Sequence, residues 1–353
     1  MKTAVLLLNF GEPEHATPDE VVPFLERIFN LNASLEGGAA APEAAARSRA
    51  LAAARAPSLI AEYRSIGGSP LHAQARAHVR ALNDRLEQHG HDVVVLQGMQ
   101  FTRPLIPEAV DHALAAGARR LVALPVYPLC GPTTTVAALA EVAAAALQRD
   151  PALELLEITG WHRHPRYLQL RAAAIRATAS AAGIDLHHPR TRLLFSAHGT
   201  PLRYIREGSR YDEYVRDLCH SMARRLEVSE YRIGYQNHSN RPGVEWTQPD
   251  IERVIDEIEG DTVVVDPVSF IHEQSETLAE LDHELRARAV ARGLDFHRVM
   301  IPHADPAFID VLMDLVTPLI AGKEPPAGLH PCRCRPTPAT FCLNAELLGT
   351  PQE

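Results

Sequence analysis

A single histidine, His198, ends an apolar run in the stretch Leu-Leu-Phe-Ser-Ala-His-Gly-Thr-Pro at residues 193–201. An imidazole titrates near neutral pH, so this side chain could accept a proton or bind a metal ion. It could equally fill a loop. The fold decides between these interpretations, because the carboxyl ends of parallel strands line the ligand crevice of doubly wound sheets.

Acidic residues recur at helical spacing after another apolar run, over residues 269–288. Glu276, Glu280 and Glu284 stand at i, i+4 and i+8, on one face of a predicted helix. We call these three residues the acidic stripe. Carboxylates in such a row could pass a divalent cation or protons along the helix, or they could form an ordinary solvated face. The spacing alone leaves both interpretations open.

The five cysteines are unevenly distributed along the chain. Three of them, Cys332, Cys334 and Cys342, follow a C-x-C-x₇-C spacing near the C-terminus, and Cys130 and Cys219 lie far upstream. An odd number of cysteines argues against a disulfide framework. Clustered thiolates are typical of a zinc site or an iron–sulfur cluster, and the alternative is a tail with incidental thiols.

Short Val-, Ile- and Leu-rich runs alternate with helical stretches along the chain. Runs of this kind are typical of strands covered on both faces, and the alternation predicts parallel sheets. We therefore predict an α/β fold with two Rossmann-like domains facing each other, each with a four-stranded parallel sheet. The strands are expected at 3–10, 91–98, 120–127, 153–160, 191–198, 231–236, 261–270 and 294–301. The helices are expected at 18–30, 43–64, 71–88, 106–117, 134–148, 166–182, 210–226, 249–259, 273–291 and 305–321.

Three segments follow from this division. The first domain covers 1–150, the second covers 151–304, and the helix at 305–321 could pack back on the first. Residues 322–353 form a C-terminal extension that is rich in Pro and Cys and has no periodicity.

The bulk properties exclude several classes of function. A length of 353 residues fits two domains, and a net charge of −9 argues against a nucleic-acid-binding surface. The N-terminal apolar run is too short for a signal peptide or a membrane span. No phosphate-binding glycine motif follows the first strand, so nucleotide binding lacks its main signature. We predict a cytoplasmic protein without a transmembrane segment, either a monomer or a homodimer, and leave peripheral membrane contact open.

Four stretches, in this order along the chain, resemble motifs of the ferrochelatase family. They are LLLNFGEP, YRSIGGSPL, FSAHGTP and VSFIHEQSETLAELD. Together with weaker matches between them, they span residues 5–282. The resemblance implies two Rossmann-like domains around a porphyrin cleft. It also implies a lyase that inserts Fe²⁺ into protoporphyrin IX or coproporphyrin III, releases two protons and forms haem.

The resemblance also implies roles for individual residues. His198 matches the active-site histidine of the family, and Glu276 matches its partner glutamate on the opposite face of the porphyrin. Glu280 and Glu284 match acidic residues that lead from the surface to that glutamate, so all four are candidate metal ligands. Gln274 stands where the family has a histidine. The candidate porphyrin-binding residues, several of them equally acceptable as core residues, are Phe10, Gly11, Ile66, Ser69, Met99 and Tyr127.

Some ferrochelatases carry a 2Fe–2S cluster held by three cysteines near the C-terminus and a fourth from within the chain. The resemblance therefore implies Cys332, Cys334 and Cys342 as ligands, with Cys130 as the fourth and Cys219 as the alternative. Two other functions remain open from the sequence. One is a chelatase for cobalt or nickel and another tetrapyrrole, and the other is a haem- or porphyrin-binding carrier or sensor without turnover.

Overall fold

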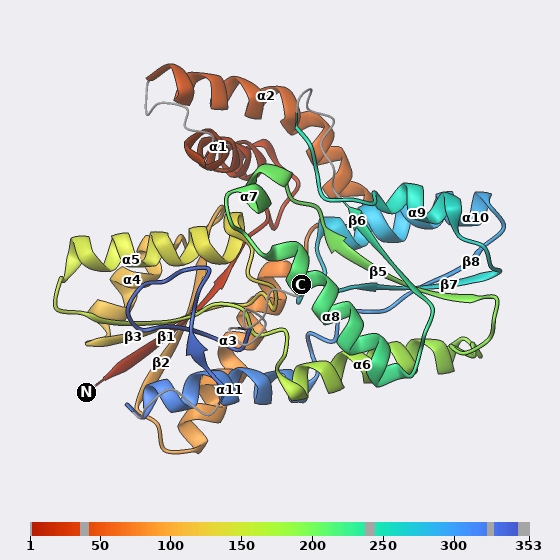
Figure 1. Ribbon diagram of the computed structural model, residues 1–353. Helices are drawn as coiled ribbons and strands as arrows, with labels where there is room; N and C mark the ends of the chain where they lie inside the picture. Colours follow the sequence, from red (N-terminus) through yellow and green to blue (C-terminus); the bar gives the residue numbers. More distant parts are fainter. Residues whose placement is uncertain (1, 36–41, 237–243, 323–327, 345–353) are drawn as a thin grey trace.

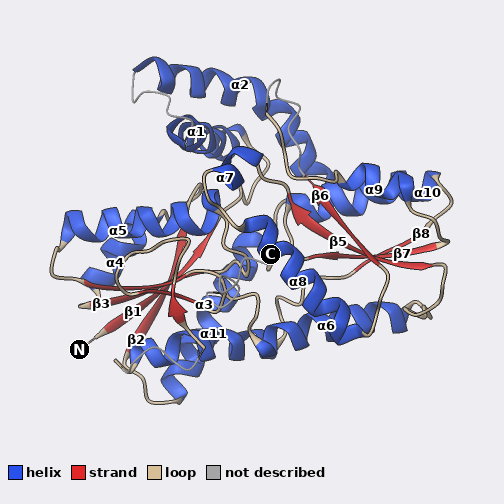
Figure 2. Ribbon diagram, viewed as in Figure 1, coloured by secondary structure: helices blue, strands red, loops and turns tan. Residues whose placement is uncertain are grey.

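Two β-sheets, each covered by helices on both faces, form the body of the molecule (Figures 1 and 2). The computed structural model describes residues 2–35, 42–236, 244–322 and 328–344. The strands of the first sheet, in spatial order, are β2 (Val93–Met99), β1 (Thr3–Asn9), β3 (Arg120–Pro125), β4 (Glu154–Ile158), β10 (Thr340–Cys342) and β9 (His330–Pro331). Those of the second are β6 (Tyr231–Gln236), β5 (Thr191–His198), β7 (Thr262–Pro267) and β8 (Asp295–Arg298).

The helices lie largely where the apolar periodicity places them. Helices α4 and α5 cover one face of the first sheet and α3 and α11 the other, while α9 and α10 lie opposite α6 and α8 around the second sheet (Figure 1). Helices α1 and α2 pack against each other as a hairpin beside this body. The helix bounds are α1 Pro18–Leu35, α2 Pro42–Ser65, α3 Leu71–Gln88, α4 Ile106–Ala115, α5 Ala137–Arg149, α6 Pro165–Ala181, α7 Leu202–Arg206, α8 Tyr211–Leu226, α9 Ile251–Glu257, α10 Arg286–Ala291 and α11 Pro306–Ile320.

Two helical segments have π rather than α geometry, η1 (Pro132–Val136) and η2 (Glu276–Leu285). The segment η2 lies inside the helix predicted at 273–291, and η1 begins two residues before the helix predicted at 134–148. The apolar pattern does not distinguish the two geometries, because an extra residue in one turn changes the local winding without changing which face is buried. Single π turns occur often at functional sites, and η2 carries the acidic stripe. The short helix α7 is absent from the sequence prediction.

The prediction of a two-sheet α/β fold is confirmed, and the second sheet has the expected four parallel strands. The first sheet differs, because the C-terminal extension adds β10 parallel to β4 and β9 antiparallel to β10. A buried carboxylate anchors these strands: Glu157 of β4 accepts two hydrogen bonds from Arg335, of 2.6 and 2.8 Å, and one from the Thr340 hydroxyl of 2.6 Å. Strands of two and three residues are too short to produce a sequence pattern.

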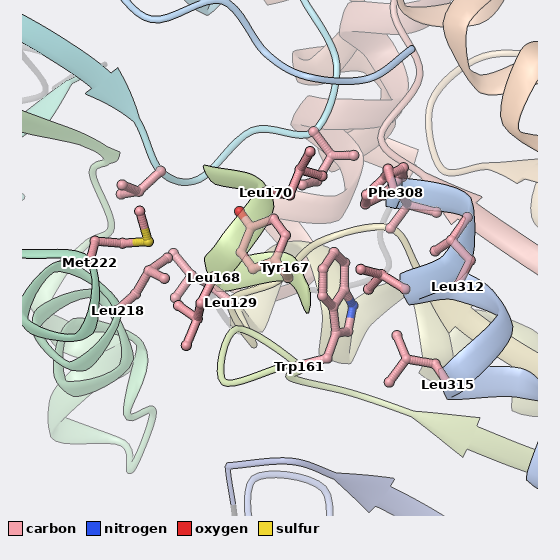
Figure 3. Close-up of a cluster of buried hydrophobic side chains, with 14 of the residues drawn as sticks. Leu129, Trp161, Tyr167, Leu168, Leu170, Leu218, Met222, Phe308, Leu312 and Leu315 are labelled. Atoms are coloured by element: carbon pink, nitrogen blue, oxygen red, sulfur yellow. The ribbon is translucent and has the colours of Figure 1, made fainter. Parts of the chain in front are cut away.

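One hydrophobic core reaches from the first sheet to the second. It includes Val5 and Leu7 of β1 as well as Leu193 and Phe195 of β5. In its middle, Trp161 packs edge-on against Tyr167 with ring centroids 5.1 Å apart. Figure 3 shows these rings between side chains from three helices, α6, α8 and α11. Helix α11 also contacts α3 and β3, so the last helix crosses between the two halves of the fold.

No helix within the described ranges is both long enough and apolar enough to cross a membrane.

Glu141 on α5 gives a pH-dependent contribution to stability. Burial raises the pKa of its carboxyl to about 7, well above the unfolded value of 4.5. Below pH 4.5 the carboxyl is neutral in both the folded and the unfolded state. As the pH rises through 7 the folded protein must bury a charge, so the free energy of unfolding falls. At pH 8 we expect Glu141→Gln to be more stable than the unsubstituted protein by about 1 kcal/mol, a value reduced because the side chain is partly exposed. At pH 4.5 this advantage should be absent.

Denaturant unfolding at both pH values measures this difference. The matched control is Glu259→Gln, at an exposed position in the loop after α9, which should change the free energy of unfolding equally at the two pH values. A Glu141→Gln effect that does not change with pH would contradict the assignment.

Candidate active site

His198 is the last residue of β5, which lies between β6 and β7 in the second sheet. Its backbone is held on both sides, since its N–H donates to Ser269 Oγ at 3.0 Å and its carbonyl accepts from the Tyr211 hydroxyl at 3.0 Å. The ring Nδ1 lies 2.7 Å from the carbonyl oxygen of Gly199. A carbonyl only accepts, so Nδ1 carries the hydrogen, and in the neutral ring the lone pair is on Nε2.

The acidic stripe runs along η2 from the surface inwards. Glu284 is exposed, whereas Glu280 and Glu276 are partly buried. Burial raises the pKa of Glu280 well above its usual range, and the charge of Glu276 adds to this effect. Glu62 of α2 faces the stripe, and its pKa is likewise raised by burial, with further contributions from Glu276 and Glu284. A path of carboxylates therefore leads towards Glu276, and the second half of the molecule does not form it alone.

Gln236, at the end of β6, fixes the stripe to the sheet. Its Nε2 donates to the carbonyl oxygen of Glu276 and to Oε2 of Glu280, both at 2.9 Å, and its Oε1 accepts from Ser196 of β5. The amide is almost completely buried. Glu280 is thereby held in place by a neutral donor, which orients the carboxylate without cancelling its charge.

Glu12 is a site residue that sequence reasoning missed. It lies in the turn after β1, within the LLLNFGEP motif, and is 2% exposed. Burial and the neighbouring charge of Glu276 together raise the pKa of its carboxyl to about 7, against hydrogen bonds from Ser275 and Ser69 that lower it. The sequence does offer one signal for Glu12. An ionisable side chain between Gly11 and Pro13, in a tight turn, has no ordinary function in a hydrophobic core.

Three of the six candidate porphyrin-binding residues, Phe10, Gly11 and Ile66, lie in this turn or directly after α2. Phe10 packs on Phe101 with ring centroids 4.5 Å apart, and Ile66 joins the same hydrophobic cluster. Gly11 has a φ of +85°, and a Cβ there would lie 2.3 Å from Oγ1 of Thr102, so only glycine fits.

The other three candidates have different surroundings. Ser69 donates a hydrogen bond to Glu12. The pKa of Tyr127 is raised by burial and, to a smaller extent, by the charges of Glu276 and Glu12. Met99 is wholly buried against Leu71 and Ala75, the core placement that was the alternative for it.

The strand orders explain why these residues meet. In the first sheet β1 lies between β2 and β3, and in the second β5 lies between β6 and β7, so each sheet reverses direction of winding at its first strand. Ligand crevices of doubly wound sheets open at the carboxyl ends of the strands at such a point. Glu12, which follows β1, accepts hydrogen bonds from Ser275, which follows β7. The two switch points therefore converge.

The cysteines of the C-terminal extension lie together with Cys130. Cys332 exchanges hydrogen bonds with Cys334 and Cys342, and Cys334 with Cys130. The bonds from Cys334 and Cys342 lower the pKa of Cys332, while the hydrogen bond with Cys130 raises that of Cys334. Cys332 also accepts from Thr159 at 3.1 Å, and Cys334 contacts the Tyr214 hydroxyl at 2.8 Å.

Four buried or half-buried thiols therefore lie together where the C-terminal extension meets the loop after β3. Cys219 is separate: it is fully buried on α8, where burial raises the pKa of its thiol. In the described ranges, however, no group of three or more His, Cys, Asp or Glu side chains is already arranged to hold a metal ion.

A cavity of about 300 Å³ lies beside α3 and the edge strand β2, away from these residues. No predicted site residue lines it. Its lining residues are His72, Arg76, Val79, Arg80, Val95, Leu96, Gln97, Arg103 and Pro104.

Comparison with known proteins identifies the family. The ferrochelatase family model matches residues 2–319. The chain is 34% identical over 347 residues to the ferrochelatase of Synechococcus sp. (strain JA-3-3Ab), covering 92% of this chain and 95% of that protein. It is 30% identical to the ferrochelatase of Geobacter metallireducens, covering 89% of this chain and 98% of that protein.

Among solved structures, SirB from Bacillus subtilis with Fe³⁺ has a similar fold, with a TM-score of 0.51 at 12% identity, over 89% of this chain and 95% of that one. The sequence matches extend over both sheets and include the motifs that carry His198 and Glu276. The chain therefore belongs to the ferrochelatase family.

Proposed function

We propose that this protein inserts Fe²⁺ into a porphyrin in haem biosynthesis, with His198 and Glu276 at the reacting centre. The observation that supports this most is that the crevices at the carboxyl ends of the two sheets meet. The hydrogen bond from Ser275 to Glu12 joins them. His198 ends β5 and the acidic stripe follows β7, which pairs in parallel with β5, so both belong to the carboxyl edge of the second sheet. Metal insertion needs both residue types, one to take protons and one to bring a dication.

His198 is the proposed proton acceptor. A porphyrin must lose two pyrrole protons when it gains a metal dication, and a neutral imidazole can take up one of them. The hydrogen bond from Nδ1 to the Gly199 carbonyl leaves the lone pair on Nε2, where a proton or a metal ion can be received. The backbone bonds to Ser269 and Tyr211 hold the residue in place when the ring becomes charged.

The acidic stripe is the proposed route for iron or protons. Oxygen ligands suit a hard dication, and the row begins at the exposed Glu284 and ends at the partly buried Glu276. Burial raises the pKa of Glu280, which favours its protonated form, so this side chain could pass a proton as well as a metal ion. Glu62 supplies a further carboxylate from α2.

The apolar residues near the turn after β1 are the proposed porphyrin wall. Phe10, Ile66 and Tyr127 are only partly buried, so these side chains could support a flat macrocycle. The porphyrin must bend so that its nitrogens face the metal, and apolar walls can hold it in that shape.

An anaerobic insertion assay tests the function. Protoporphyrin IX and coproporphyrin III are each mixed with Fe²⁺, Co²⁺ or Zn²⁺, and the metalloporphyrin is followed by its absorption. We expect Fe²⁺ insertion into one of the two porphyrins, and the ratio of their kcat/KM values identifies the substrate. Tight porphyrin binding without insertion of any metal would contradict the proposal and favour the carrier alternative. A preference for cobalt with neither porphyrin accepted would favour another chelatase.

We also propose that the C-terminal extension holds a 2Fe–2S cluster through Cys130, Cys332, Cys334 and Cys342. The contacts among these thiols support the ligand set, and the contact between Cys334 and Cys130 favours Cys130 over Cys219 as the fourth ligand. When bound, the cluster would cross-link the extension to the loop after β3. The extension itself contributes two short strands and little core of its own.

The cytoplasmic location and the state as monomer or homodimer stay predictions. Fractionation of cells and light scattering of the purified protein measure them.

A further inference from the structure

Glu12 connects three parts of the molecule that are distant in the sequence. The Tyr63 hydroxyl of α2 donates to its Oε1 at 3.1 Å, and the Ser69 hydroxyl before α3 donates to its Oε2. Ser275, which is 263 positions away, donates to it through both its backbone N–H and its hydroxyl. The side chain is 2% exposed, so these donors replace water around the carboxyl.

The bonds from Ser275 place Glu12 at the beginning of η2. Ser275 is the residue before the first residue of that helix, and its own side chain makes no capping bond to it. Glu12 accepts the backbone N–H of Ser275 at 3.4 and 3.3 Å, so a carboxyl from the first half of the chain caps a helix of the second. A negative charge is favourable at a helix N-terminus.

Ser275 also contacts Glu276. Its Oγ lies 3.1 Å from Oε2 of Glu276, and the same oxygen accepts from Nε2 of Gln274 at 2.7 Å. The orientation of the Glu276 carboxylate therefore depends on where Ser275 is held. Glu12 holds Ser275 through both its backbone and its side chain. Displacements of about 1 Å at a reacting group can lower a rate by about 100-fold.

We infer that Glu12 is a positioning residue for the reaction, holding Glu276 in place through Ser275. This inference rests on the proposed function, in which Glu276 faces the porphyrin. The turn after β1 would then have a second function besides the proposed substrate contact. The contacts that hold it against the beginning of η2 would also orient the Glu276 carboxylate.

Steady-state insertion kinetics of Glu12→Ala, Ser275→Ala and the double variant test the inference. We expect each single variant to lower kcat by about 10- to 100-fold with the KM for porphyrin within about twofold. The double variant should be no more than about twofold slower than Ser275→Ala, because both residues act through one chain of contacts. If Glu12 merely stabilised the fold, Glu12→Ala would lower kcat by the same factor in the unsubstituted protein and in the Ser275→Ala variant.

Two further variants make the result specific. Glu12→Gln keeps the size and one acceptor oxygen but loses the acceptor for Ser69, so its kcat should fall between those of the unsubstituted protein and Glu12→Ala. It also provides the test if Glu12→Ala fails to fold. Glu14→Ala, in the same turn but exposed and paired with Arg76 at 2.7 Å, is the matched control and should keep full activity.

The outcomes separate the two claims. If the unsubstituted protein inserts no metal, the proposed function fails. If it does so and Glu12→Ala and Glu12→Gln keep their kcat, the function stands and this inference is wrong. Fully multiplicative effects of Glu12→Ala and Ser275→Ala would also overturn it.

Discussion

Replacing His198 with alanine is expected to lower the kcat of iron insertion by at least about 100-fold, the usual contribution of a general acid or base. Porphyrin affinity should stay within about twofold, because the apolar wall residues are untouched. The fold should also persist, since Ser269 and Tyr211 bind the backbone of residue 198 and not its ring. The anaerobic assay measures kcat, and porphyrin fluorescence quenching measures binding.

The matched control for this variant is His220→Ala. His220 lies exposed on α8 and should tolerate the change without loss of activity. Insertion at an unchanged rate by His198→Ala would remove His198 from the mechanism. Lost porphyrin binding together with lost activity would assign His198 to substrate binding instead. Glu276→Gln, which keeps the size of the side chain but removes its charge, should slow insertion to a similar extent.

Replacing Cys332 with serine is expected to abolish the proposed 2Fe–2S cluster. Of the cysteines in the extension, Cys332 contacts both Cys334 and Cys342, so its loss removes a thiol from the middle of the set. The purified protein should be brown, and the variant should lose its visible absorption and its bound iron and sulfide. It should also melt several degrees lower, at about 2–4 °C for each kcal/mol lost, because the cross-link of the extension is gone.

Cys219→Ser is the matched control for the cluster. Cys219 is buried on α8 and is not among the contacting thiols, so the variant should stay brown. A colourless Cys219→Ser protein together with a brown Cys130→Ser protein would reverse the assignment of the fourth ligand. A colourless, iron-free unsubstituted protein that contains zinc would replace the cluster by a zinc site.

Local patterns in the sequence were sufficient for the frame of the molecule. The strands at 191–198 and 231–236 and the helix at 71–88 have the predicted bounds, because continuous apolar runs and helical periodicity depend only on near neighbours. The same argument placed His198 at a strand end and the acidic stripe on one helix face. The family motifs then gave these residues a chemistry.

Contacts between distant segments were beyond the reach of those patterns. The π turns of η1 and η2, the two strands of the C-terminal extension and the meeting of Cys130 with the three late cysteines all depend on packing. Glu12 shows the reason most clearly, since its partners Tyr63, Ser69 and Ser275 come from two segments that are about 200 residues apart in the chain. A sequence pattern reports periodic burial, whereas the environment of one buried carboxyl is fixed only when both sheets have folded and their carboxyl ends meet.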